Sequence, residues 1–113
     1  MKTNELTGAA LDWAVAKCEK FKLAPVDSGD TCVYYDDDQD NLQAYSPSKD
    51  WARGGPIIER EGISVREYLK GFWAADIQNG AHERENPTPL IAAMQCYVAS
   101  KLGDEIEIPE ELA

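Results

Sequence analysis

Two stretches of the chain, one near each end, repeat hydrophobic residues at the spacing of a helix with one buried face. In the first stretch the repeat at i, i+3, i+4 and i+7 consists of Leu11, Ala14, Val15 and Cys18, and it is widened by Leu6, Ala10 and Trp13. Asn4 is a residue type that caps helices, and Glu5 would lie in the positive first turn. We therefore expect a helix that begins after Asn4, packs this stripe on a core and ends before Pro25.

The second stretch is bounded by clear start and stop signals. Thr88 can cap a helix, Pro89 suits its first position, and Gly103 follows its last turn. Its stripe consists of Ile91, Met94, Val98 and Leu102, broadened by Leu90 and Tyr97. After this helix, Ile106 and Ile108 alternate with acidic residues, which predicts a short strand or an extended tail.

Between the two helices the pattern changes to short runs typical of strands. The run from Thr31 to Tyr35 is rich in β-branched and aromatic residues and predicts a strand. A turn at 27–30 precedes it, a loop at 36–41 follows it, and 42–45 is expected to form a short partner strand. Further turns are expected at 46–50 and at Gly54-Gly55-Pro56.

The region from Ile57 to Gly80 allows more than one interpretation. Ile57-Ile58 predicts the start of a brief strand that ends by Gly62. Ser64 can cap a short helix through Tyr68, Leu69 and Phe72, or residues 72–75 can form a strand that closes before Asn79-Gly80, a good turn pair. We prefer a short helix followed by a strand. The expected fold is α+β: a small single domain whose N-terminal and C-terminal amphipathic helices pack on a short, mainly antiparallel sheet.

Composition supports one globular domain over residues 1–113. Hydrophobic residues make up 43% of the 113 positions and charged residues 28%, and no internal repeat or linker is visible. The longest apolar run, Leu90 to Met94, is far shorter than the ~20 residues that span a bilayer. Residues 1–20 contain acids and do not resemble a signal peptide, so we expect a cytoplasmic protein. Three cysteines without a CxxC pair are expected to be reduced and mostly buried.

The charge balance argues against direct contact with nucleic acid. Twenty-one acids against eleven Lys and Arg give a formal net charge of −10. A protein that grips phosphates needs a basic face, and the basic residues at 17–22 and at 49–53 form no stripe. The acids at 36–40 and 104–111 leave a different possibility, in which the protein mimics nucleic acid and occupies a host protein's DNA groove. The simpler interpretation is that the negative charge keeps the protein soluble.

The sequence contains no complete catalytic or metal-binding motif. Asp36, Asp38 and Asp40 are spaced like the start of a calcium loop, but Asn41 and Pro47 stand where its glycine and its bidentate glutamate would be. One histidine, His82, and scattered cysteines do not make a zinc site or a catalytic triad. We expect no catalytic residues, no metal and no cofactor.

One segment is a candidate recognition surface. Residues 45–61 combine large aromatic, charged and glycine residues in a stretch that is expected to be largely irregular, and such loops often bind partners. The candidate site consists of Tyr45, Asp50, Trp51, Arg53, Gly54, Gly55 and Glu59, together with Trp73. Arg53 beside Trp51 could bind an anion or stack on a base. The alternative is that Trp51 plugs the core beneath a long loop while Arg53 lies in solvent.

Four segments in order resemble the phage NinX family. They are Leu6 to Trp13, Tyr45 to Ser48 with Asp50-Trp51, Gly54 to Glu59, and Pro87 to Leu90. The resemblance covers the whole chain and implies a phage or prophage origin, a host bacterial cytoplasm, and no particular reaction. Two departures from the family pattern are a longer, more charged 65–85 stretch and Gln95, where relatives often have a basic residue.

These observations lead to one expected function and two alternatives. We expect a non-catalytic accessory protein that binds a host protein or a small anionic ligand, the partner and the oligomeric state being unspecified. The first alternative is the acidic nucleic-acid mimic described above. The second is a hydrolase acting on a nucleotide, for which we find neither a metal site nor a base.

Overall fold

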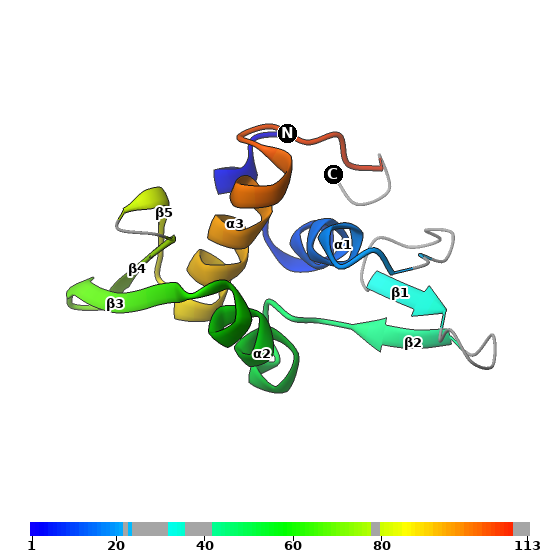
Figure 1. The fold of residues 1–113 in the computed structure, drawn as a ribbon, viewed down its shortest axis with the longest axis horizontal. Coiled ribbons are helices and arrows are strands. Elements are labelled where there is room, and N and C mark those ends of the chain that lie inside the picture. The colour runs from blue at the N-terminus through cyan, green and yellow to red at the C-terminus, as the bar shows by residue number, and fades with distance from the viewer. Residues whose placement is uncertain (22, 24–31, 36–41, 78–79, 110–113) are drawn as a thin grey trace.

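Helix α3 (Pro89–Leu102) runs through the middle of the molecule, and the other α-helices and the larger sheet pack against it (Figure 1). In this computed structural model the described residues are 1–21, 23, 32–35, 42–77 and 80–109. The N-terminal part contributes a 3-10 helix, η1 (Thr3–Glu5), and helix α1 (Gly8–Cys18). The α+β fold class predicted from the sequence is confirmed. None of the helices in the described ranges is long and apolar enough to cross a membrane.

A three-stranded antiparallel sheet covers one side of α3. It consists of β3 (Ile63–Leu69), β4 (Phe72–Ile77) and β5 (Ala81–Asn86), in that spatial order. Ile63 pairs with Ile77 and Val65 with Ala75, and these side chains belong to the core or pack against it. The preferred short helix from Ser64 through Phe72 is therefore wrong. The strand predicted at 72–75 is confirmed, and β4 extends it to Ile77.

The strand pair expected at 31–35 and 42–45 is confirmed. Strands β1 (Cys32–Tyr35) and β2 (Leu42–Tyr45) pair antiparallel, with Cys32 opposite Tyr45. This hairpin lies beside α1, away from the larger sheet (Figure 1). The turn predicted at 27–30 and the acidic loop predicted at 36–41 lie outside the described residues.

The first helix starts later than the sequence predicted. Asn4 lies within η1, and α1 begins at Gly8 after Thr7. The reason is tertiary, because the segment before α1 pairs with the extended tail after α3: Thr3 N donates to Asp104 O over 2.8 Å, and Lys2 bridges Glu105. The expected stripe of α1 is otherwise confirmed, and Leu11, Ala14 and Val15 are fully buried.

The largest difference from the sequence prediction is helix α2 (Trp51–Glu61). We expected turns and a brief strand here because Gly54, Gly55 and Pro56 usually interrupt helices. Asp50 starts the helix by accepting a hydrogen bond from Ala52 N over 2.9 Å, and Gly62 ends it in a left-handed conformation at φ 68°. Residues 45–61 are therefore not a long loop, and Ile57-Ile58 is not a strand.

Helix α3 has the predicted boundaries, with Thr88 at the N-cap, Pro89 at the first position and Gly103 after the last residue. Its burial is more extensive than one stripe would give. Every residue from 92 to 99 is buried, because sheet, α1, α2 and η1 contact it from different sides. Gln95 is the polar residue within that run, and its Nε2 donates to Leu6 O over 2.8 Å. The extended tail predicted at Ile106 and Ile108 is confirmed, since both half-buried side chains pack against the core.

Candidate functional site

The first turn of α2 carries the two residues central to the predicted recognition surface. Trp51 is the first residue of the helix and 54% exposed, so the alternative in which it plugs the core is wrong. Arg53 is also exposed. Asp50, predicted as a contact residue, caps the helix: its carboxylate accepts the hydrogen bond of Ala52 N. The aromatic ring and the guanidinium group are thus presented on a helix and not on a loop.

Some other members of the predicted surface are buried in the fold and cannot contact a partner. Tyr45 is 3% exposed and its ring meets Phe21 edge-on at 5.1 Å between centroids. Gly54 is buried where α2 crosses α3, while Gly55 borders open space. Glu59 is exposed on the outer side of α2. The surface that remains for a partner is therefore smaller than the predicted 45–59 segment.

Trp73 does not belong to the same surface as Trp51. Trp51 is at the beginning of α2, and the end of α2 leads directly into β3. Trp73 lies opposite Glu67, close to the far end of β3. Along the chain, the two tryptophans are separated by the whole of α2, about 16 Å long, and by most of β3, about 20 Å long.

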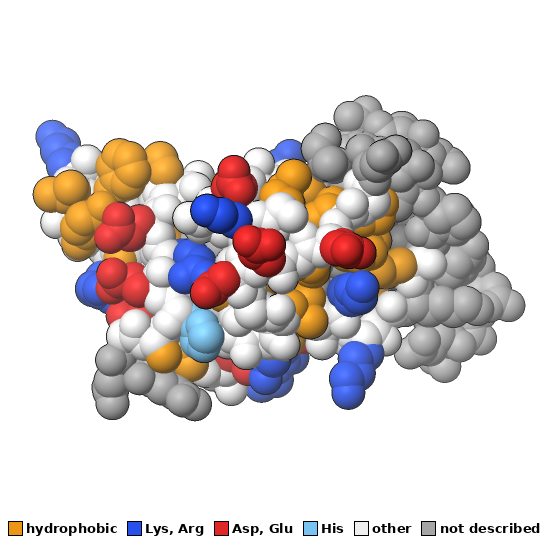
Figure 2. Space-filling model, turned by 90° about the horizontal axis from the view of Figure 1, so that it is seen from above, with side chains coloured by type: hydrophobic (Ala, Val, Ile, Leu, Met, Phe, Trp, Pro, Cys, Tyr) orange, Lys and Arg blue, Asp and Glu red, His pale blue; other side chains and the backbone are white. Residues whose placement is uncertain are grey.

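An apolar cluster that the sequence analysis did not single out lies at the turn between β3 and β4. Its members are large and exposed: Tyr68 at 42%, Leu69 at 59% and Phe72 at 42%. Figure 2 shows hydrophobic side chains gathered at this end of the molecule. We call Tyr68, Leu69 and Phe72 the hairpin cluster. The signal in the sequence was Lys70-Gly71 between apolar residues, with Gly71 at φ 84° in the turn.

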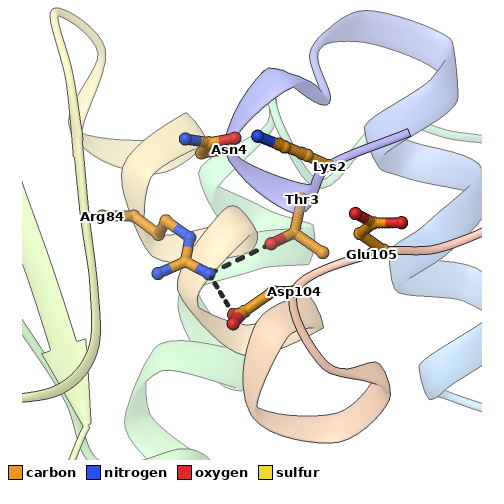
Figure 3. Close-up of a pocket in the computed structure, with 6 residues that line it drawn as sticks. All are labelled: Lys2, Thr3, Asn4, Arg84, Asp104 and Glu105. Atoms are coloured by element: carbon orange, nitrogen blue, oxygen red, sulfur yellow. Dashed lines mark hydrogen bonds and ion pairs between the residues drawn. The ribbon is translucent and has the colours of Figure 1, made fainter.

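A polar pocket of about 360 Å³ lies where the segment before α1, strand β5 and the tail after α3 meet. All the residues that line it are polar or charged: Lys2, Thr3, Asn4, Arg84, Asp104 and Glu105. Figure 3 shows Thr3 and Asp104 facing Arg84 from different segments, with Lys2 beside Asn4 and Glu105 on the other side of Thr3 from Arg84. Sequence reasoning missed this pocket, because its residues come from both ends of the chain and from a stretch that we could not assign to helix or strand.

Arg84 is the fixed cation of this pocket. Its side chain is only 15% exposed, whereas that of its ion-pair partner Asp104 is 84% exposed. The Arg84 Nη2 donates to Thr3 Oγ1 over 3.1 Å and to Asp104 Oδ1 over 2.9 Å, and Nη1 donates to Glu83 O over 2.8 Å. The Arg84 Nε is buried and has no hydrogen-bond partner among the described residues.

A separate polar network joins the three α-helices. Arg60 on α2 donates to both carboxylate oxygens of Glu19, over 3.0 and 2.6 Å, and Tyr97 donates to the same carboxylate over 2.5 Å. Burial raises the pKa of Glu19, but the hydrogen bonds from Arg60 and Tyr97 outweigh burial and lower it. Burial and the Glu19 hydrogen bond also raise the pKa of Tyr97. These groups satisfy one another, so we interpret the network as structural.

The single histidine does not contact a nucleophile. His82 is exposed and lines a cavity of about 190 Å³ that also includes Ser100, Lys101 and Glu61. Ser100 Oγ donates to the carbonyl of Tyr97 over 2.6 Å, which is the bond of a serine to its own helix. Within the described ranges, no group of three or more potential metal ligands occurs.

Two of the cysteines are free thiols shielded by the core. Cys96 is buried on α3, and Cys18 is half-buried at the end of α1. Burial raises the pKa of Cys18 to about 12 and that of Cys96 to about 11. Such thiols are poor nucleophiles at neutral pH, because the thiolate is the reactive form.

Comparison with known proteins identifies a phage family and no characterised relative. The sequence model of the family described as "Bacteriophage P22, NinX" matches residues 2–101. No curated protein matches the chain. The family match spans both the hairpin cluster and α2, and it includes four residues of the polar pocket, Lys2, Thr3, Asn4 and Arg84.

Proposed function

Because the chain belongs to the NinX family of bacteriophage proteins, matched over residues 2–101, we propose that it is an accessory protein that binds a host protein in the bacterial cytoplasm. It acts without catalysis in this proposal. The observation that carries the proposal is the hairpin cluster, in which Leu69 is 59% and Phe72 42% exposed at one end of a highly charged protein. Contiguous exposed apolar side chains of this size mark interaction sites.

The cluster has the composition of an interface centre. Aromatic residues are enriched in interfaces, and charged residues are depleted at the centre and concentrated at the rim. Burying the exposed parts of Leu69 and Phe72 would contribute about 1.5–3 kcal/mol before the costs of association. Tyr68 is held in place by its hydroxyl, which donates to Glu85 over 2.9 Å. The ring therefore loses little conformational entropy when a partner covers it.

The surface of Trp51 and Arg53 is a second candidate contact within the same proposal. An exposed tryptophan and an exposed cation in the first turn of one helix suit a partner that offers both an apolar side chain and a carboxylate. The same pair also suits a small anionic ligand. Trp51 has no other large exposed hydrophobic residue near it on α2, so we place this surface after the hairpin cluster.

The test is crosslinking in infected cells followed by mutation of each surface. Lys70 lies in the turn between β3 and β4, so an amine-reactive crosslinker attached there should join it to the partner. The variant L69S/F72S should lose this product, while the control L102S, which alters a hydrophobic residue that is 37% exposed on α3, should keep it. The variant W51A/R53A tests the second surface in the same way.

The results separate the proposals. Loss of the crosslinked protein in L69S/F72S, with unchanged circular dichroism and thermal stability, supports the hairpin cluster. Loss in W51A/R53A alone would transfer the contact to α2. Retention in both folded variants would refute binding through either surface.

Nucleic-acid mimicry predicts a different response. A mimic would bind its target through many charges, so its affinity would fall steeply with salt. Several acids in the described part of the chain already form ion pairs, among them Glu19, Glu61, Asp76 and Glu83. We therefore favour an interface whose affinity changes little between low and moderate salt.

A further inference from the structure

The polar pocket combines a fixed cation with an acid that is free to move away. Arg84 reaches the pocket from β5 and is held by Thr3 and by the carbonyl of Glu83. The carboxylate of Asp104 is held in the described structure by Arg84 alone, and the side chain is 84% exposed. Rotation of Asp104 into solvent would cost little, whereas moving Arg84 would break its other hydrogen bonds.

The unused hydrogen-bonding capacity of Arg84 points toward a ligand. A guanidinium has five N–H donors in a planar fork that matches a carboxylate. In Arg84 the Nε donor is buried without a partner among the described residues. Nε and Nη2 are the pair that an anion can bind side-on, and Nη2 now holds Asp104. A ligand carboxylate in the place of Asp104 would accept from Nη2, and it would accept from Nε as well once it displaces the atoms that now bury this donor.

The charges of the lining residues restrict the ligand further. Two cations, Lys2 and Arg84, face two acids, Asp104 and Glu105, so the formal charge of the lining is balanced. A phosphate or a dicarboxylate would bring two negative charges toward both acids on a chain of net charge −10. A ligand with one carboxylate and one ammonium group avoids this repulsion, because each of its charges meets an opposite charge.

We propose that this pocket binds a small polar α-amino acid. The ligand carboxylate replaces that of Asp104 on Arg84, and the ligand ammonium is held by Asp104 and Glu105. The exposed amide of Asn4 offers further hydrogen bonds to a polar side chain, whereas the buried hydroxyl of Thr3 holds Arg84 in place. A volume of about 360 Å³ lies at the lower end of the roughly 300–1,000 Å³ typical of small-molecule sites. An entirely polar lining favours a polar amino acid over a hydrophobic one.

The experiment compares five probes on the full chain by isothermal titration calorimetry. Serine and glutamine represent the proposed ligands, acetate carries only the anion, ethylamine carries only the cation, and inorganic phosphate carries a higher negative charge. We expect measurable binding of at least one of the two amino acids, and binding of acetate and ethylamine that is at least about tenfold weaker, because each lacks one charge-assisted contact. Equal or tighter binding of acetate or phosphate would overturn the assignment, as would no binding of either amino acid.

Variants at Asp104 give a test that does not depend on Arg84, whose replacement could unfold the pocket. Asp104→Asn should weaken amino-acid binding about tenfold, because the ammonium loses a charged partner. The same variant should strengthen acetate binding, because the neutral amide that replaces the carboxylate no longer competes for Arg84 as an anion. The matched control is Glu107→Gln, an exposed acid on the same tail outside the pocket lining. Equal effects of the two variants on both probes would refute the proposed roles of Asp104.

Discussion

Two adjacent glycines in α2 face different surroundings, and their replacement by alanine should therefore have unequal effects. A Cβ added at Gly54 would lie 2.6 Å from Leu90 Cδ1 and 2.7 Å from the carbonyl oxygen of Pro47. A Cβ added at Gly55 would have no heavy atom of another segment within 4 Å. The two glycines lie in the same turn of the same helix, so the comparison of the two variants isolates the contact with Leu90 and Pro47.

The magnitudes follow from three effects. Alanine is favoured over glycine inside a helix by about 0.5–1 kcal/mol. At Gly55 this gain is opposed, because the ring of Pro56 disfavours the helical conformation of a preceding residue that carries a Cβ. At Gly54 the side chain of Leu90 can rotate, but the Pro47 oxygen belongs to the backbone, so the turn before α2 must move. Overpacking of this kind costs about 1–3 kcal/mol. We expect Gly54→Ala to lower the free energy of unfolding by about 1–3 kcal/mol more than Gly55→Ala does.

Urea denaturation followed by circular dichroism at a helical wavelength measures both variants on one scale. If the free energy of unfolding falls with urea concentration at the same slope in both variants, the two unfold with the same change in exposed surface. A Gly54→Ala protein as stable as Gly55→Ala would refute the close approach of α2 to α3. A larger loss of stability in Gly55→Ala than in Gly54→Ala would show instead that α2 does not pack as described.

Two further predictions concern buried carboxylates. Glu19 has a pKa below its ordinary value of 4.5, because the hydrogen bonds from Arg60 and Tyr97 outweigh burial; its contribution to stability is present above that value and is lost as the pH falls through the folded pKa. Glu19→Gln should therefore lower the free energy of unfolding by about 1 kcal/mol at pH 7, a small value because Arg60 is half exposed to solvent. An equal loss at pH 3 in a denaturation series would contradict this. Burial raises the pKa of Asp12, and its carboxylate accepts the backbone N–H of Ser48 over 2.9 Å. Asp12→Ala should therefore lower the free energy of unfolding by about 1–3 kcal/mol, and Asp12→Asn should lower it less, because the amide oxygen can still accept this hydrogen bond. Equal thermal shifts in the two variants would show that the hydrogen bond does not explain the loss.

Helix α2 shows why local sequence signals failed where tertiary contacts were strong. Gly54-Gly55-Pro56 lowers the intrinsic helix propensity of the segment, and from the sequence alone this argued for a turn. In the fold, the Asp50 cap starts the helix. Gly54 also lets it approach Leu90 more closely than a residue with a Cβ could. The contact that stabilises α2 lies in another part of the chain, so no pattern within residues 51–61 could predict it.

The β3–β4 hairpin was misassigned for a related reason. Val65, Tyr68, Leu69 and Phe72 have spacings compatible with a helical stripe, but in the structure only Val65 of the four packs on the core. The other three are exposed and form the hairpin cluster. A periodicity argument assumes that hydrophobic residues are buried, so residues kept outside for a partner mislead it. The failure of the prediction therefore coincides with the surface on which the proposed function rests.

The polar pocket marks the limit of what one sequence can reveal about a site. The helix boundaries of α3 and the strands β1 and β2 depend on neighbouring residues, and the sequence predicted them. Arg84 meets Thr3 and Asp104 only because the segment before α1 pairs with the tail after α3 beside β5. Their separations of 81 and 20 residues carry no motif. Charge balance across such a pocket becomes visible only when the fold brings the three segments together, and the net charge of −10 gives no sign of it.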